Sequence, residues 1–167
     1  MDATPSFALA TLLIGGGATL VMDLWAAVQR RLFGVPGLNY ALVGRWIGHL
    51  RHGRLSHPGI AAAATIRGEA VIGWSAHYAI GIAFAALLLG LWGLEWARDP
   101  TPGPALLVGV GTVAAPFLIL QPGMGAGIAA RRTPQPNLAR LRSLGAHLSF
   151  GVGLYVAALI AAPVLPG

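Results

Sequence analysis

The sequence predicts an all-α integral membrane protein, a bundle of four transmembrane helices in one domain over residues 1–167. Hydrophobic residues make up 56% of the chain and charged residues only 10%, whereas an ordinary soluble domain is about one quarter charged. Four apolar segments, each near the ~20 residues that a spanning helix needs, cover residues 7–28, 70–94, 104–130 and 143–162. These segments do not alternate apolar and polar residues, as the strands of a transmembrane barrel would.

The first segment, residues 7–28, is predicted to be a retained span. The residues before it provide neither the basic region nor the small-residue cleavage site of a signal peptide, and the segment ends before Arg30 and Arg31. The second segment, residues 70–94, begins after Glu69 and has charged residues on both sides. We therefore expect both segments to cross the bilayer as helices.

A long connection joins these two spans, and residues 40–50 within it form an amphipathic stretch. One helical face is apolar and consists of Leu42, Val43, Trp46, Ile47 and Leu50. Arg45, His49 and His52 fall elsewhere around the helix. The pattern predicts a helix lying in the cytoplasmic interface, and a basic anchor for anionic lipid is favoured over a lid on a substrate. The loose cluster of His49, His52 and His57 is a weaker candidate for metal binding.

The third and fourth segments differ in regularity. The third, residues 104–130, contains Pro116 and Pro122, so it either ends near Leu120 or continues as a kinked helix. A break there would free backbone groups to line a cavity. The fourth, residues 143–162, is uninterrupted by proline until its last residues.

The arginines predict the orientation of the spans. All eleven basic residues are arginine, and ten of them lie in the connections after the first and third spans. Basic connections stay in the cytoplasm, so both chain termini are expected on the outer side. Arginines that flank spans in this way favour topology over nucleic-acid binding. The absence of cysteine excludes disulfides and thiolate metal sites.

Two matching stretches indicate an internal repeat. Residues 76–82 and 146–152 both read Ala-His-x-x-apolar-Gly-apolar. The second and fourth spans therefore align, and the first and third align more weakly, which suggests two helix-pair halves related by an axis along the membrane normal. The alternative is a chance alignment of segments that are rich in Gly, Ala and Leu.

Counting from the flanking charges places several polar residues at similar depth. Asp23, His77 and His147 each fall roughly 7–12 Å inside the cytoplasmic side at 1.5 Å per residue. Ionisable residues inside a membrane are functional candidates by default, so these three form the predicted site. Its secondary members are Gln121, Met124 and Tyr78.

Four functions are compatible with this group. His77 and His147 could be the axial ligands of a b-type haem, or could hold a divalent metal together with Asp23. The same residues could form a proton or ion relay in a small transporter. Acid–base catalysis is disfavoured because no nucleophile pattern accompanies them. Finally, they could be interhelical hydrogen bonds in a structural or accessory subunit, whose partner is another membrane protein or a second copy.

Several stretches together resemble a known family. They are residues 22–25, 34–40, 44–46, 76–81, 121–127 and 142–155. They are similar to the small bacterial inner-membrane proteins grouped as domain of unknown function 2938, and the similarity extends over nearly the whole chain. The resemblance implies a four-helix, multi-pass protein of the bacterial inner (cytoplasmic) membrane, whose termini the arginine distribution places in the periplasm. It implies no activity.

Overall fold

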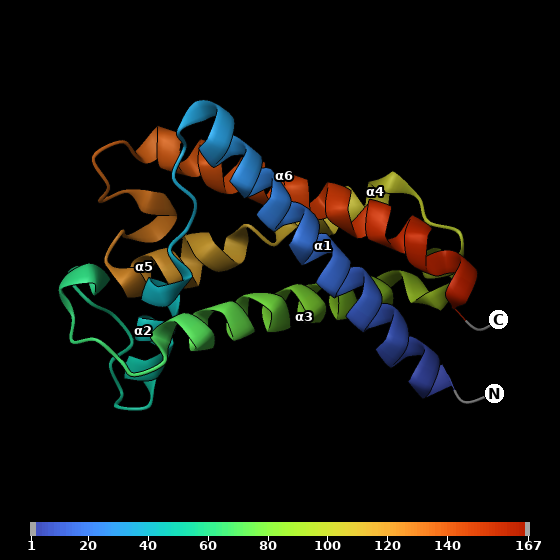
Figure 1. Ribbon diagram of the computed structural model, residues 1–167, viewed down its shortest axis with the longest axis horizontal. Helices are drawn as coiled ribbons and strands as arrows, with labels where there is room; N and C mark the ends of the chain where they lie inside the picture. Colours follow the sequence, from blue (N-terminus) through green and yellow to red (C-terminus); the bar gives the residue numbers. More distant parts are fainter. Residues whose placement is uncertain (1–2, 166–167) are drawn as a thin grey trace. The chain divides into compact units, whose positions relative to one another are not determined.

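The computed structural model describes residues 3–165, with side chains from residue 6 onward (Figure 1). Within that range every regular element is a helix, which confirms the all-α prediction. The predicted periplasmic ends, Met1 and Gly167, lie outside the described residues.

Four helical segments are long and apolar enough to cross a membrane, which confirms the predicted number of spans. They are Ser6–Phe33, Glu69–Arg98, Pro102–Met124 and Pro136–Val164. The first, second and fourth correspond to helix α1 (Ala3–Phe33), helix α3 (Glu69–Arg98), and helix α6 (Pro136–Ala161) with its short extension η4 (Ala162–Val164). Each begins or ends several residues beyond the apolar run that predicted it, because a helix continues through its polar flanking turns.

The third span is irregular, and it ends before the predicted residue 130. It consists of α4 (Pro102–Gly111), the π-helical turn η2 (Pro116–Leu120) and α5 (Gln121–Met124). Proline at position 116 has no N–H to give to the preceding turn, and the hydrogen-bonding pattern changes at this point. Gly125, with φ at 99°, then closes α5 in the left-handed conformation.

The chain forms two compact units. Unit 1 contains the residues up to 36 together with residues 78–112 and those from 146 onward; unit 2 contains residues 37–77 and 113–145. Helices α3 and α6 and the third span therefore contribute residues to both units.

Unit 1 is held together by helices that contact one another through small residues. A Cβ atom added at Gly15 on α1 would lie 2.5 Å from the Cα atom of Ile82 on α3. One added at Gly109 on α4 would lie 2.6 Å from the backbone nitrogen of Gly151 on α6. Such close approach is the usual packing mode of helices in membranes. The largest fully buried side chains around these crossings are Ile14, Leu88, Leu89 and Leu154.

Unit 2 is built around helix α2 (Tyr40–Leu50), which has the predicted bounds. The Asn39 side chain caps it by accepting a hydrogen bond from the backbone N–H of Ala41 at 3.0 Å. The unit also contains η1 (Ile60–Ala62) and η3 (Ile128–Ala130). Arg45 and His49, which lie outside the apolar face of α2, are buried against the protein, where both have hydrogen-bond partners.

Candidate functional site

His77 lies on α3 in unit 2 and contacts the side chain of Tyr40 on α2. Its Nε2 atom is 3.0 Å from the Tyr40 hydroxyl. The two rings are stacked, with centroids 4.2 Å apart and an interplanar angle of 28°. Trp74, one turn before His77, contacts both rings, with centroids 4.5 Å from Tyr40 and 5.8 Å from His77. The histidine is therefore part of an aromatic contact between two helices.

Asp23 lies on α1 in unit 1 and forms a hydrogen bond with Tyr78, a secondary member of the predicted site. The hydroxyl of Tyr78 on α3 donates a hydrogen bond to its Oδ2 atom at 3.0 Å. The structure thus brings two members of the predicted site together, through a bond between α1 and α3.

His147 lies on α6 in unit 1 and contacts Thr112, the residue that follows α4. Its Nδ1 atom is 3.0 Å from the threonine hydroxyl oxygen, and the same hydroxyl donates to the Gly109 carbonyl at 2.7 Å. A hydroxyl has only one hydrogen to donate. The N–H of His147 is therefore the donor in the contact with Thr112.

Gln121 and Met124 lie on α5 in unit 2. The Gln121 amide nitrogen donates to the Ser143 hydroxyl at 3.1 Å. The amide oxygen of Gln121 is buried and has no hydrogen-bond partner among the described residues. Met124 is the last residue of α5 before the left-handed Gly125.

The predicted metal site of Asp23, His77 and His147 stays a prediction. Among residues 3–165, no group of three or more His, Cys, Asp and Glu side chains stands close enough to hold a metal ion. Each of the three residues instead has a hydrogen-bond partner of the Tyr or Thr type.

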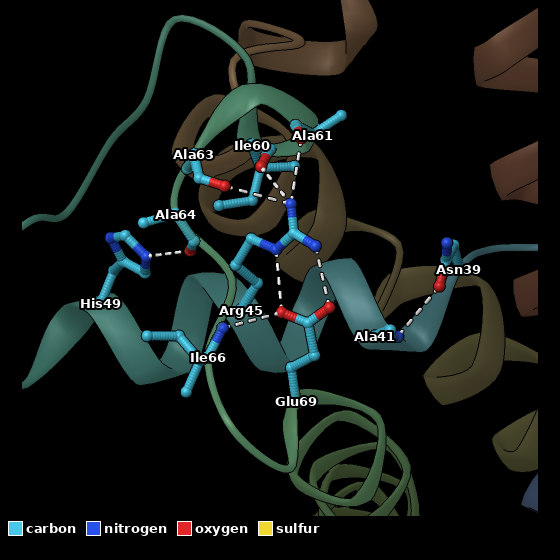
Figure 2. A network of polar contacts seen from close by, with 10 residues as sticks. All are labelled: Asn39, Ala41, Arg45, His49, Ile60, Ala61, Ala63, Ala64, Ile66 and Glu69. Carbon is cyan, nitrogen blue, oxygen red and sulfur yellow. Dashed lines mark hydrogen bonds and ion pairs between the residues drawn. The ribbon is translucent and has the colours of Figure 1, made fainter.

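Sequence reasoning missed a partly buried ion pair that organises unit 2 (Figure 2). The Arg45 guanidinium on α2 donates to both carboxylate oxygens of Glu69, at 2.9 and 2.8 Å. Its remaining nitrogen donates to carbonyl oxygens of the segment around η1, those of Ile60, Ala61 and Ala63. Hydrogen bonding to Glu69 raises the pKa of Arg45 above its usual value. The pair joins α2, the η1 segment and the start of α3.

The second feature of unit 2 is a pair of buried histidines, His49 on α2 and His57 in the following loop. Their side chains are 5% and 9% exposed, and His49 Nδ1 lies 3.2 Å from His57 Nε2. Figure 2 shows the other ring nitrogen of His49 directed at the Ala64 carbonyl oxygen, 2.9 Å away. His52, the third member of the cluster noticed in the sequence, is exposed.

Four long apolar helices, with hydrogen bonds between half-buried polar side chains, define an all-helical protein of the multi-pass membrane type. Residues 12–161 match the model of the family described as protein of unknown function (DUF2938), and the chain belongs to that family. The match covers nearly the whole chain and confirms the resemblance drawn from the motifs. No curated protein and no solved structure matches the chain.

Proposed function

We propose that this protein is a structural or accessory membrane protein, in which Asp23, His77 and His147 join helices to one another. One observation carries the proposal: each histidine binds a hydroxyl group on the helix that crosses its own helix at a nearby glycine. The residues that could have formed a reactive centre are thereby part of helix–helix contacts.

The crossing beside His77 lies between α2 and α3. A Cβ atom at Gly44 would lie 2.7 Å from the backbone nitrogen of Gly73, so the two backbones are in direct contact there. Tyr40 precedes Gly44 by one turn, and His77 follows Gly73 by one turn. Residues four apart share a helix face, and this places the Tyr40–His77 hydrogen bond directly beside the crossing.

The crossing beside His147 lies between α4 and α6. Gly109 and Gly151 are the residues in backbone contact. Thr112 lies one turn after Gly109, and His147 lies one turn before Gly151. The Thr112–His147 hydrogen bond therefore also lies beside the crossing. Interhelical hydrogen bonds of this kind contribute on average about 0.6 kcal/mol each in a membrane protein.

Optical spectra and elemental analysis of the purified full-length protein test the proposal against haem and metal binding. We expect no Soret band and no stoichiometric metal bound through His77 or His147. A Soret band, or a bound metal that the His77→Ala variant loses, would refute the packing role and establish the cofactor hypothesis. Proton uptake by vesicles that contain the protein, abolished by Asp23→Asn, would favour the relay hypothesis instead.

We further propose that the protein lies in the bacterial inner membrane with both ends in the periplasm. The distribution of arginine between the connections supports this orientation. A reporter enzyme fused after Gly167 should show periplasmic activity. Cytoplasmic activity would overturn the orientation.

Anionic phospholipid is the partner that we propose for unit 2. This unit holds eight of the eleven arginines, and its acidic residue, Glu69, is already paired with Arg45. The exposed arginines of the unit are Arg51, Arg54, Arg67, Arg131, Arg132 and Arg142. Each basic residue near an anionic surface contributes about 1 kcal/mol of attraction.

Native mass spectrometry with phosphatidylglycerol or phosphatidylcholine tests this partner. We expect retained phosphatidylglycerol and little retained phosphatidylcholine. The double variant Arg131→Gln/Arg132→Gln should retain less of the anionic lipid, whereas the single variant Arg98→Gln, which alters an arginine of unit 1, should not. Equal retention of the two lipids by the wild type would contradict the proposal.

A further inference from the structure

We infer that the His49–His57 pair in unit 2 is a binding site for a transition-metal ion of the Zn²⁺ or Cu²⁺ type. The site is separate from the group of Asp23, His77 and His147. It also does not depend on the packing role proposed for that group.

The hydrogen-bond partners of the two rings favour one tautomer for each ring. His49 Nε2 faces the carbonyl oxygen of Ala64 at 2.9 Å, and His57 Nδ1 faces that of Gly123 at 3.4 Å. A carbonyl oxygen only accepts hydrogen bonds, so the nitrogen that faces it carries the hydrogen. A neutral imidazole has one N–H, and therefore the remaining nitrogen of each ring presents a lone pair.

The lone pairs of the two rings face each other. His49 Nδ1 and His57 Nε2 are only 3.2 Å apart, and the rings approach by their edges, with an interplanar angle of 77°. Two acceptors at this distance need a cation between them. Two imidazole nitrogens on a tetrahedral Zn²⁺ with bonds of 2.0–2.1 Å stand about 3.3 Å apart, which is close to the separation in this pair.

The surroundings of the pair are those of metal-binding histidines. Such residues almost always donate their second ring N–H to a carboxylate, a backbone carbonyl or water, as both His49 and His57 do here. The backbone N–H of His57 also donates to the Gly123 carbonyl at 3.0 Å, which fixes the loop against α5. Arg45, one turn before His49 on α2, is neutralised by Glu69. The two histidines would supply two imidazole ligands to the ion.

Electron paramagnetic resonance of Cu²⁺ added to the full-length protein in detergent identifies the nitrogen ligands of the ion directly. We expect one Cu²⁺ per chain, with splitting from two imidazole nitrogens, and displacement by Zn²⁺. This measurement on the wild type needs no substitution, so a failure of a variant to fold does not affect it. A spectrum with one imidazole nitrogen or none would overturn the inference.

Substitutions of individual histidines then show which residues bind the metal ion. His49→Gln and His57→Gln should weaken Zn²⁺ binding by at least about tenfold, since loss of even an outer partner of a ligating histidine has that effect. His52→Gln is the matched control, because it removes an exposed histidine from the same segment and should leave binding unchanged. His77→Ala should also leave it unchanged, which separates this site from the group in the spans.

A shared proton is the competing occupant of the pair. Nitrogen-15 NMR of the imidazole rings distinguishes the two, because Zn²⁺ displaces the proton from a true metal site and shifts both facing nitrogens. If stoichiometric Zn²⁺ leaves the resonances of both rings unchanged, the pair holds a proton only and the metal site is refuted.

Discussion

The contact between α2 and α3 yields the sharpest test of the packing in unit 2. We consider the substitution Gly73→Ala. A Cβ atom at this position would collide with the carbonyl oxygen of Tyr40 and would lie 2.6 Å from its carbonyl carbon. Ordinary contacts begin at 3.4 Å. Because the obstacle is the backbone of α2, no side-chain rotation can relieve the collision, and the two helices must move apart.

The expected loss in the free energy of unfolding is best measured against a second glycine on the same helix. Overpacking of a well-packed contact typically costs about 1–3 kcal/mol, whereas alanine in place of glycine in a helix interior gains about 0.5–1 kcal/mol. Gly90 lies on α3 and has nothing within 4 Å of the position where its Cβ would be. Gly90→Ala should therefore gain the same helix stability as Gly73→Ala without the collision. The two variants should differ in the free energy of unfolding by about 1–3 kcal/mol.

The assay is unfolding in mixed micelles with increasing sodium dodecyl sulfate, followed by circular dichroism and tryptophan fluorescence. Gly73→Ala should unfold at lower denaturant than the wild type, and Gly90→Ala at the same or higher denaturant. Equal stability of the two variants would show that α2 and α3 do not cross in backbone contact, and would remove the basis for the role given to His77.

Four further substitutions test particular backbone and side-chain features by the same assay. Ala129→Gly should stabilise the protein by about 0.5–1 kcal/mol, because Ala129 has φ at 47°, a conformation that costs an L-residue about 1–2 kcal/mol. Gly93→Ala should destabilise it by about 1–3 kcal/mol, since φ at 78° and ψ at 171° suit glycine alone. Arg45→Lys should lower the denaturant concentration at the unfolding midpoint almost as much as Glu69→Gln, because a lysine cannot reproduce the two-pronged contact. A lysine variant as stable as the wild type would show that only the charge matters.

Most of the fold could be predicted from hydrophobicity and charge. The four spans and the helix over residues 40–50 were predicted because each depends on local composition. The polar side of that helix was predicted less well. Arg45 was expected outside the apolar face, yet it is 8% exposed. Its partner Glu69 lies 24 residues further along the chain, and no spacing rule relates residues so far apart.

The candidate site was predicted only in part for the same reason. The sequence singled out His77 and His147 as polar residues beside small ones, and both are half-buried. Their hydroxyl partners are 37 and 35 residues away in the chain, and no spacing rule relates residues so far apart. The buried pair of His49 and His57 depends on a loop conformation that composition does not specify.

The two histidines that match in sequence have different surroundings. Gly81 and Gly151 occupy equivalent positions in the pattern, and each meets the preceding span: Gly81 approaches Thr19 on α1, and Gly151 approaches Gly109 on α4. The hydroxyl partner of His147, Thr112, likewise directly follows α4, the preceding span. The hydroxyl partner of His77, Tyr40, belongs instead to α2, which lies between the first two spans in the chain.

If the histidines act through separate partners, their substitutions should be energetically independent. The losses of stability in His77→Ala and His147→Ala should then add in the double variant to within about 0.3–0.5 kcal/mol. A metal or haem held by both residues predicts the opposite, because the first substitution already destroys the site and the second has little left to remove. Unfolding of the two single variants and the double variant in micelles measures the difference. A double variant no less stable than the weaker single variant would refute separate roles and return the pair to a common ligand.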